Sequence, residues 1–189
     1  MASRGSALAL RQSEGVAQAL RDAHPGLEVE IRAVETRGDK DQRSFAAIGA
    51  KGLFVAEVEQ AVVDGRADLA VHSAKDLTAQ LAEGCAILCV PRRAPAHDVI
   101  VGADGIEDLP SGATVGTSSM RRRALLAELR PDLDVVDFRG NLDTRLRKVQ
   151  EGVVDAAILA AAGLARLEVK AGSPIDPDRW VPAPGQGAL

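Results

Sequence analysis

The chain has very few aromatic side chains. It contains three phenylalanines, one tryptophan and no tyrosine among 189 residues. Hydrophobic residues nevertheless make up 46% of the chain, so its core must consist mainly of Ala, Val and Leu. The length suits one large or two small domains.

Long apolar segments are also absent. No run approaches the ~20 apolar residues of a membrane-spanning helix, and residues 1–5 lack the apolar centre of a signal peptide. We therefore expect a cytoplasmic protein without a membrane partner.

Cysteine is scarce, and the two residues, Cys85 and Cys89, are four apart. On a strand they would share one face at a separation too large for a disulfide. They lack the spacing of a zinc site, and free cysteines are usually buried. We expect a core strand over residues 85–90 and no metal.

The net charge of −4 argues against nucleic acid as a partner. The basic clusters are therefore local features of an acidic protein, which favours a focused anion-binding site.

Polar and charged clusters follow several expected strands. Strand 67–71 is followed by Ser73, Lys75 and Asp76, and strands 114–116, 133–138 and 156–159 are each followed by basic or hydroxyl residues. In open α/β sheets, ligands bind beyond the carboxyl ends of strands. One carboxylate facing many cations indicates a polyanionic ligand whose chemistry develops positive charge.

Strands and helices alternate along the chain, which predicts mainly parallel sheets flanked by helices. A helix is expected over about 7–23, a strand over 28–34 and a helix from 52 to 62, and 91–95 is expected to be a hinge. We expect two lobes with a cleft between them: residues 1–92, to which 185–189 return, and residues 93–184.

Five segments together resemble the porphobilinogen deaminases, also called hydroxymethylbilane synthases: HSAKD, VGTSSMRRR, DFRGNLDTRL, DAAILAAAGLARL and PAPGQGA. The resemblance implies two lobes of periplasmic-binding-protein type II architecture. It also implies a transferase of porphyrin and heme biosynthesis, which joins four porphobilinogen units and releases ammonia each time. We expect a monomer.

The resemblance implies a dipyrromethane cofactor and assigns residues to it. Each pyrrole ring carries two carboxylates, which arginine binds through its planar fork. The residues expected at the cofactor are Ser73, Lys75, Thr117, Ser119, Arg121, Arg122, Arg139, Asn141 and Arg145. Arg123 is expected on the surface. Asp76 is the expected catalytic residue, because its carboxylate would stabilise the cation left when ammonia departs.

Other residues match family positions at porphobilinogen or the growing polypyrrole chain. These are Arg4, Ser6, Lys51, Arg166 and Gln186. Lys51 lies in a glycine-flanked loop that resembles the family's mobile lid, and Ala47 stands where the family commonly has a second lysine.

The chain stops at Leu189, whereas the family has a third, C-terminal domain with the cysteine that anchors the cofactor. We therefore expect a truncated chain that has no turnover alone and no bound cofactor.

Two other classes of protein compete with this interpretation. A two-lobed module that binds a small anion without chemistry is disfavoured by the Lys75–Asp76 pair and the missing signal peptide. A nucleotide-binding α/β protein is disfavoured because no Gly-x-Gly-x-x-Gly or Walker sequence opens a helix.

Overall fold

The computed structural model of the chain describes residues 1–40, 52 and 54–189. Within them the chain divides into two compact units. The first unit comprises residues 1–93 with 188–189, and the second comprises residues 94–187. The division expected from the sequence, into a domain of residues 1–92 with 185–189 and a domain of residues 93–184, stays a prediction.

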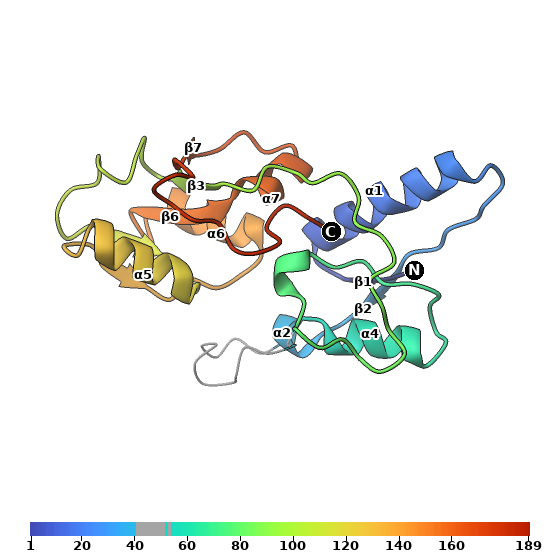
Figure 1. Cartoon of the computed structure of the whole chain (residues 1–189). Coiled ribbons are helices and arrows are strands. Elements are labelled where there is room, and N and C mark those ends of the chain that lie inside the picture. The colour runs from blue at the N-terminus through green and yellow to red at the C-terminus, as the bar shows by residue number, and fades with distance from the viewer. Residues whose placement is uncertain (41–51, 53) are drawn as a thin grey trace. The chain divides into compact units, whose positions relative to one another are not determined.

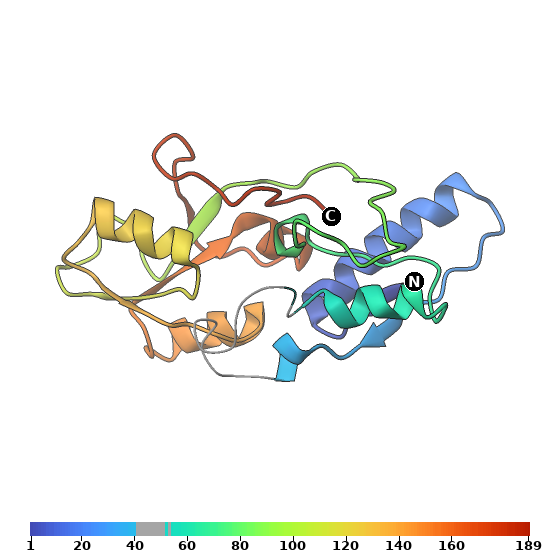
Figure 2. The same ribbon diagram turned by 60° about the horizontal axis from the view of Figure 1, so that its bottom comes forward.

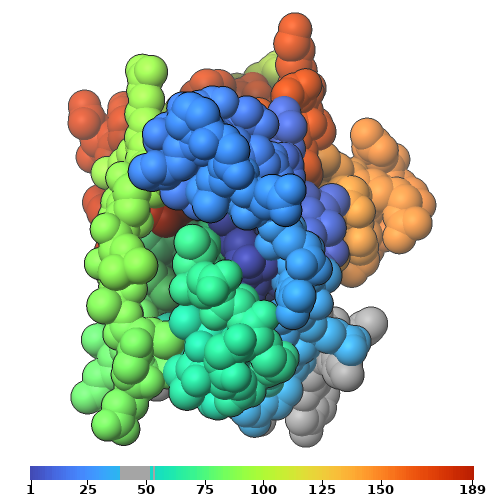
Figure 3. Space-filling view, turned by 90° about the vertical axis from the view of Figure 1, so that its right-hand side faces the viewer, coloured from blue at the N-terminus to red at the C-terminus, as the bar shows by residue number. Residues whose placement is uncertain are grey.

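The first unit contains a pair of parallel strands, β1 (Ala2–Arg4) and β2 (Arg32–Val34). Helix α1 (Ala7–Ala23) contacts β1, and helix α4 (Ala56–Val63) contacts both strands. The two helices lie on opposite sides of the strands (Figure 1), and the N-terminal residues, dark blue in Figure 3, are visible between them. The small core joins Ala2, Val58, Ala61 and Ala67.

Helix α1 begins and ends where the sequence predicts. The Ser6 hydroxyl accepts a hydrogen bond from the Ala9 amide at 3.3 Å, which caps one of the free N–H groups of the first turn. The helix ends at Ala23, with His24 as its C-cap residue, ahead of Gly26 with its φ of 89°. Short helical turns α2 (Arg37–Lys40) and η1 (Ala74–Asp76) complete the unit.

The second unit is built on a five-stranded sheet with the order β5-β4-β6-β3-β7. Its strands are β3 (Asp98–Val101), β4 (Thr114–Gly116), β5 (Asp134–Val136), β6 (Ala156–Ala160) and β7 (Ser173–Pro174). Strands β4, β5 and β6 are parallel, whereas β3 pairs antiparallel with both β6 and β7.

A helix follows each parallel strand of the second unit. These helices are α5 (Met120–Leu129), α6 (Leu142–Gln150) and α7 (Ala161–Arg166). In Figure 2, α5 (yellow) and α6 (orange) are seen as separate helices beside the sheet. Side chains such as Ile100, Val115, Leu126, Ile158 and Trp180 are buried in one hydrophobic cluster. The expected α/β class is confirmed.

Of the strands expected in the first unit, one is absent from the structure and another contributes only an isolated bridge. Residues 85–90 form no strand: Cys89 is exposed and Cys85 is half-buried, so the prediction of a core strand with two buried cysteines fails. This segment belongs to the extended light-green stretch in Figure 3. Residues 67–71 contribute only a parallel bridge between Ala70 and Ala2.

The expected strand 28–34 shortens to β2, and the expected helix 52–62 begins later, at Ala56. Among the described residues, no helix is both long and apolar enough to cross a membrane.

Candidate functional site

Three parallel strands of the second unit end at the same edge of the sheet, here called the carboxyl edge. Gly116 pairs with Val136 and with Ala157, so the segments that follow β4 and β5 emerge together beside the end of β6. This arrangement brings Ser119, Arg139 and the helix α7 to one edge, as expected for a ligand site of an α/β sheet.

Hydroxyl groups shape the turn between β4 and α5. The Ser119 hydroxyl caps α5 by accepting from the Arg122 amide, and the Thr117 hydroxyl accepts from the Ser119 amide at 3.2 Å. The Ser118 hydroxyl accepts from the Phe138 amide at 3.0 Å, which ties this turn to the segment after β5. The predicted helix cap is therefore confirmed at Ser119, and Thr117 is a buried support of the turn.

The turn before α6 places two of the predicted arginines. The Nε of Arg145 donates to the Gly140 carbonyl at 2.8 Å, and the Nζ of Lys148 donates to the Arg139 carbonyl at 3.2 Å. Gly140 has a φ of 121°, which L side chains rarely adopt. Asn141 is the exposed N-cap residue, but its side chain makes no capping hydrogen bond.

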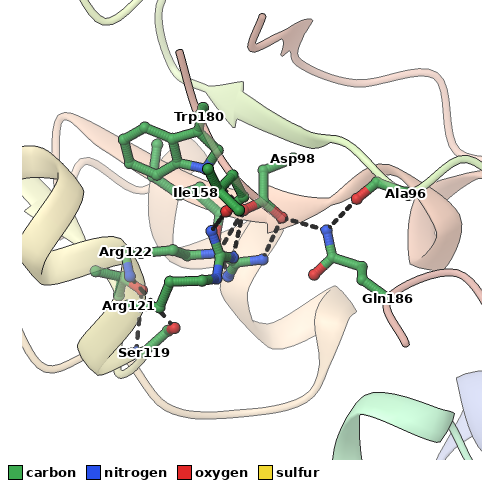
Figure 4. A network of polar contacts seen from close by, with 10 residues as sticks. Ala96, Asp98, Ser119, Arg121, Arg122, Ile158, Trp180 and Gln186 are labelled. Carbon is green, nitrogen blue, oxygen red and sulfur yellow. Dashed lines mark hydrogen bonds and ion pairs between the residues drawn. The ribbon is translucent and has the colours of Figure 1, made fainter. Parts of the chain in front are cut away.

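Asp98 lies at this same edge, because β3 runs antiparallel and Asp98 pairs with Ala160 at the end of β6. Its side chain is fully buried. Figure 4 shows side chains from three other segments converging on it. Its donors are Arg121 Nη2 (2.7 Å), Arg122 Nε (3.0 Å) and Nη2 (2.6 Å), Trp180 Nε1 (2.8 Å) and Gln186 Nε2 (2.8 Å).

Asp98 is held ionised. Burial opposes its ionisation, but the hydrogen bonds and charge of Arg122, with further hydrogen bonds from Arg121 and Trp180, outweigh that effect. The pKa of Asp98 therefore lies well below its ordinary value of 3.8.

The arginines of this cluster differ in exposure. The side chain of Arg122 is 8% exposed and also donates to the Ile158 carbonyl at 2.7 Å. The side chain of Arg121 is 23% exposed and donates to the Val181 carbonyl, while its buried Nε has no hydrogen-bond partner among the described residues. Arg123 is not simply a surface residue, because it donates to the Val135 carbonyl at 2.9 Å.

Two more predicted residues lie in or contact the segment before residue 188. Gln186 is buried and donates to the Ala96 carbonyl at 2.6 Å as well as to Asp98. Arg166, at the end of α7, donates to the Gly187 carbonyl at 2.7 Å, and burial lowers its pKa.

The first unit has its own polar edge. Arg4 ends β1, and its guanidinium lies 4.1 Å from the centre of the Phe54 ring. The parallel bridge between Ala2 and Ala70 brings the segment after Ala70 to the same edge. The Nε2 of Gln12, on α1, donates to the Ser73 hydroxyl at 3.0 Å.

Lys75 and Asp76 lie in the turn η1 and are both exposed. The turn is held by a hydrogen bond from the Asp76 amide to the Ser73 carbonyl and by one from the Ala74 amide to the Ala188 carbonyl. Burial lowers the pKa of His72, which the charge of Asp76 partly opposes. His72 is thus neutral near neutral pH and lies four residues before an exposed carboxylate.

Sequence reasoning missed three residues: Gln12, Asp98 and Trp180. The available signals were a charge directly before an apolar strand, at Asp98, and a lone tryptophan in a Pro- and Gly-rich segment. Lys51 and Ala47, in the expected lid, lie outside the described residues.

The second unit thus defines an α/β protein with arginine and hydroxyl residues gathered at the carboxyl edge of its sheet. The family model described as "Porphobilinogen deaminase, dipyromethane cofactor binding domain" matches residues 1–189. The chain belongs to the porphobilinogen deaminase family.

Individual relatives agree with this membership. The chain is 50% identical to a porphobilinogen deaminase of Nitratidesulfovibrio vulgaris, covering 100% of this chain and 61% of that protein. It is 52% identical to that of a Roseiflexus species, with 98% and 63% covered. The chain therefore spans somewhat less than two thirds of these relatives' length.

A solved structure with a similar chain is the periplasmic VFT2 domain of Bordetella pertussis BvgS. It is 23% identical with a TM-score of 0.45, over 87% of this chain and 65% of that chain.

Proposed function

We propose that this chain is the part of a porphobilinogen deaminase that holds the dipyrromethane cofactor and acts on porphobilinogen. The observation that carries the proposal is the family match over all residues, 1–189. The chemistry of the carboxyl edge supports it, because cationic and hydroxyl groups suit a ligand with two carboxylates on every ring.

The residues of the second unit fit an acidic cofactor. Arg121 fits such a site because its side chain is partly exposed and shares the single carboxylate of Asp98 with Arg122, which leaves an excess of positive charge. At the same edge, Ser119 caps α5, Arg139 precedes α6, and Arg145 lies near the start of α6. When bound, the cofactor supplies the primer to which the first ring is joined.

The buried Arg122 fits direct contact with the cofactor less well than Arg121, because Asp98 and Ile158 already accept from its guanidinium. The assignments of Arg122, Thr117, Asn141, Ser73 and Lys75 to the cofactor stay predictions.

Asp76 is the proposed catalytic residue. Its exposed carboxylate can approach a pyrrole N–H and stabilise the positive charge that develops as porphobilinogen loses ammonia. His72, four residues earlier in the chain, has a lowered pKa and therefore adds no competing positive charge near neutral pH.

Arg4, Ser6, Lys51, Arg166 and Gln186 are the proposed contacts of porphobilinogen and the growing chain. Of these, Gln186 and Arg166 also have structural hydrogen bonds within the second unit. The cytoplasmic location and the monomeric state stay predictions.

Turnover tests the proposal. Porphobilinogen consumption and hydroxymethylbilane release are measured for the chain alone and for the chain joined to the C-terminal part of the Roseiflexus relative. We expect product only from the joined protein, and Asp76→Asn should lower its rate by at least ~100-fold, the scale of losing one preorganised electrostatic group.

Asp76→Glu is the matched variant: it keeps the charge but displaces it by one methylene, so some activity should survive. A joined protein that binds porphobilinogen without releasing product would favour a binding module. An Asp76→Asn rate near that of the parent would end the assignment of Asp76.

A further inference from the structure

We propose that Asp98 is a positioning residue, which orients the guanidinium of Arg121 toward an anionic ligand at the carboxyl edge. The identity of that ligand, a carboxylate of the cofactor or of porphobilinogen, rests on the proposed function. The orientation itself rests on the contacts within the second unit.

Asp98 acts through its neighbours because it cannot reach a ligand itself. Its side chain is fully buried, and donors from Arg121, Arg122, Trp180 and Gln186 surround both carboxylate oxygens. A carboxylate that accepts this many hydrogen bonds is fixed in position. Figure 4 shows these donors arriving from different segments.

The two arginines are held unequally. Arg122 gives Asp98 two hydrogen bonds, from Nε and Nη2, and a third donor of its guanidinium binds the Ile158 carbonyl. Arg121 gives Asp98 one, from Nη2, donates to the Val181 carbonyl as well, and is the more exposed of the two. Arg122 therefore anchors the carboxylate, and the carboxylate in turn fixes Arg121 at the ligand side.

The net charge of the cluster also favours an anionic ligand near Arg121. Two guanidinium groups share one carboxylate, so the cluster keeps one net positive charge at the carboxyl edge. This surplus suits an acidic ligand, while the burial of Arg122 prevents the ligand from replacing Asp98 as the partner of that arginine.

The network around Asp98 also contains a natural fluorescent probe, Trp180. Trp180 is the one tryptophan of the chain, which has no tyrosine, and its Nε1 donates to the same Asp98 oxygen as Arg121 Nη2. A ligand that reorients Arg121 should therefore change the fluorescence of Trp180.

The experiment compares anion binding to the chain and to Asp98→Asn. Inorganic sulfate and porphobilinogen are titrated at constant ionic strength, followed by Trp180 fluorescence and calorimetry. If Asp98 only contributed charge, its removal would make the edge more positive and tighten binding. Positioning predicts the reverse, a loss of about 10-fold or more in affinity for both probes.

Matched variants separate charge, folding and orientation. Asp104→Asn removes an exposed acid beyond the other end of β3 and should leave both affinities within about 2-fold. Asp98→Leu combined with Arg122→Met removes the buried pair at constant net charge, a replacement that proteins commonly tolerate. It leaves Arg121 without its carboxylate, so binding should stay weak although the protein folds.

Each outcome decides the matter. Binding by Asp98→Asn or by the double variant at the parent's affinity would overturn the proposal. So would a double variant that fails to fold, or a parent chain that binds neither probe. A parent that binds sulfate but not porphobilinogen, with the sulfate affinity still dependent on Asp98, would leave the positioning role intact and refute the proposed ligand.

Discussion

At the scale of single residues, Arg121 and Asp76 should fail in different ways. In the protein joined to the C-terminal part of its relative, Arg121→Ala removes a carboxylate partner and should leave most of the purified protein without cofactor. Asp76→Asn should retain the cofactor, because that change affects charge development during the reaction. Intact-mass spectrometry of both variants measures the cofactor content.

Arg130→Ala is the control for the loss of an arginine. Arg130 pairs with the neighbouring Asp132 and with carbonyls of the 106–109 segment, away from the proposed ligand contacts. Its variant should keep a full cofactor content. Equal loss of cofactor from both arginine variants would contradict the role of Arg121.

His72 should make stability depend on pH near neutrality. Its pKa in the folded chain is lowered from 6.5, with burial as the main cause. The unfolded chain therefore binds more protons, and the free energy of unfolding should fall as the pH drops below about 6.5. Urea denaturation followed by circular dichroism between pH 7.5 and 5.5 should show this fall, and His72→Gln should reduce it.

The matched control is His24→Gln, which changes an exposed histidine just after α1. It should leave the pH dependence as in the parent. A His72→Gln protein with an unchanged pH profile would show that another group titrates in this range.

At the scale of elements, the carboxyl edge depends on close packing between β4 and the segment after β5. A Cβ at Gly116 would lie 2.5 Å from Cγ of Phe138, a buried side chain. Gly116→Ala should therefore lower the free energy of unfolding by about 1–3 kcal/mol, the usual cost of overpacking. Chemical denaturation followed by Trp180 fluorescence measures the change.

Two further variants test this explanation. Phe138→Ala should recover part of the loss when added to Gly116→Ala, since it removes the Cγ and Cδ atoms of the clash. Gly15→Ala, on α1 with no neighbouring atom within 4 Å, should instead stabilise the protein by about 0.5–1 kcal/mol. Additive effects at Gly116 and Phe138 would contradict a direct clash.

At the scale of the whole molecule, the exposed residues Arg92 and Arg93 stand at the boundary between the two compact units. Brief trypsin treatment should cleave there first, because exposed connections between units are preferred sites of proteolysis. The fragment beginning at Ala94 should keep the emission spectrum of a buried tryptophan. Its Asp98 network lies entirely within residues 94–187.

Mass spectrometry identifies the first cut and fluorescence reports on the fragment. Early cleavage inside 94–187, or a spectrum of exposed tryptophan after cleavage at 92–93, would show that the second unit does not hold together alone. Arg92→Gln with Arg93→Gln should slow the first cut and supplies the control.

Local signals in the sequence were enough to predict much of the fold and the residues that follow the parallel strands at the carboxyl edge. The α1 boundaries follow from Ser6 and the Pro25–Gly26 stop, which act within a few residues. The hydroxyl and arginine clusters after 114–116 and 133–138 were placed correctly at one edge, since parallel neighbours end on the same side. The family was visible in short motifs, and the match over residues 1–189 confirms it.

Only the tertiary structure determines which charged residues form ion pairs with one another. The rule that ligands lie beyond strand carboxyl ends overlooked Asp98, because β3 is antiparallel and its first residue reaches that edge. The ion pair with Asp98 also buries the side chain of Arg122. Its neighbours in the sequence, Arg121 and Arg123, are arginines as well, so residue type alone does not show which of the three is buried. Residues 85–90, which contain both cysteines, are predicted to be a strand but form none in the structure. Strand direction and burial depend on partners far along the chain, whereas residue type and local pattern do not specify those partners.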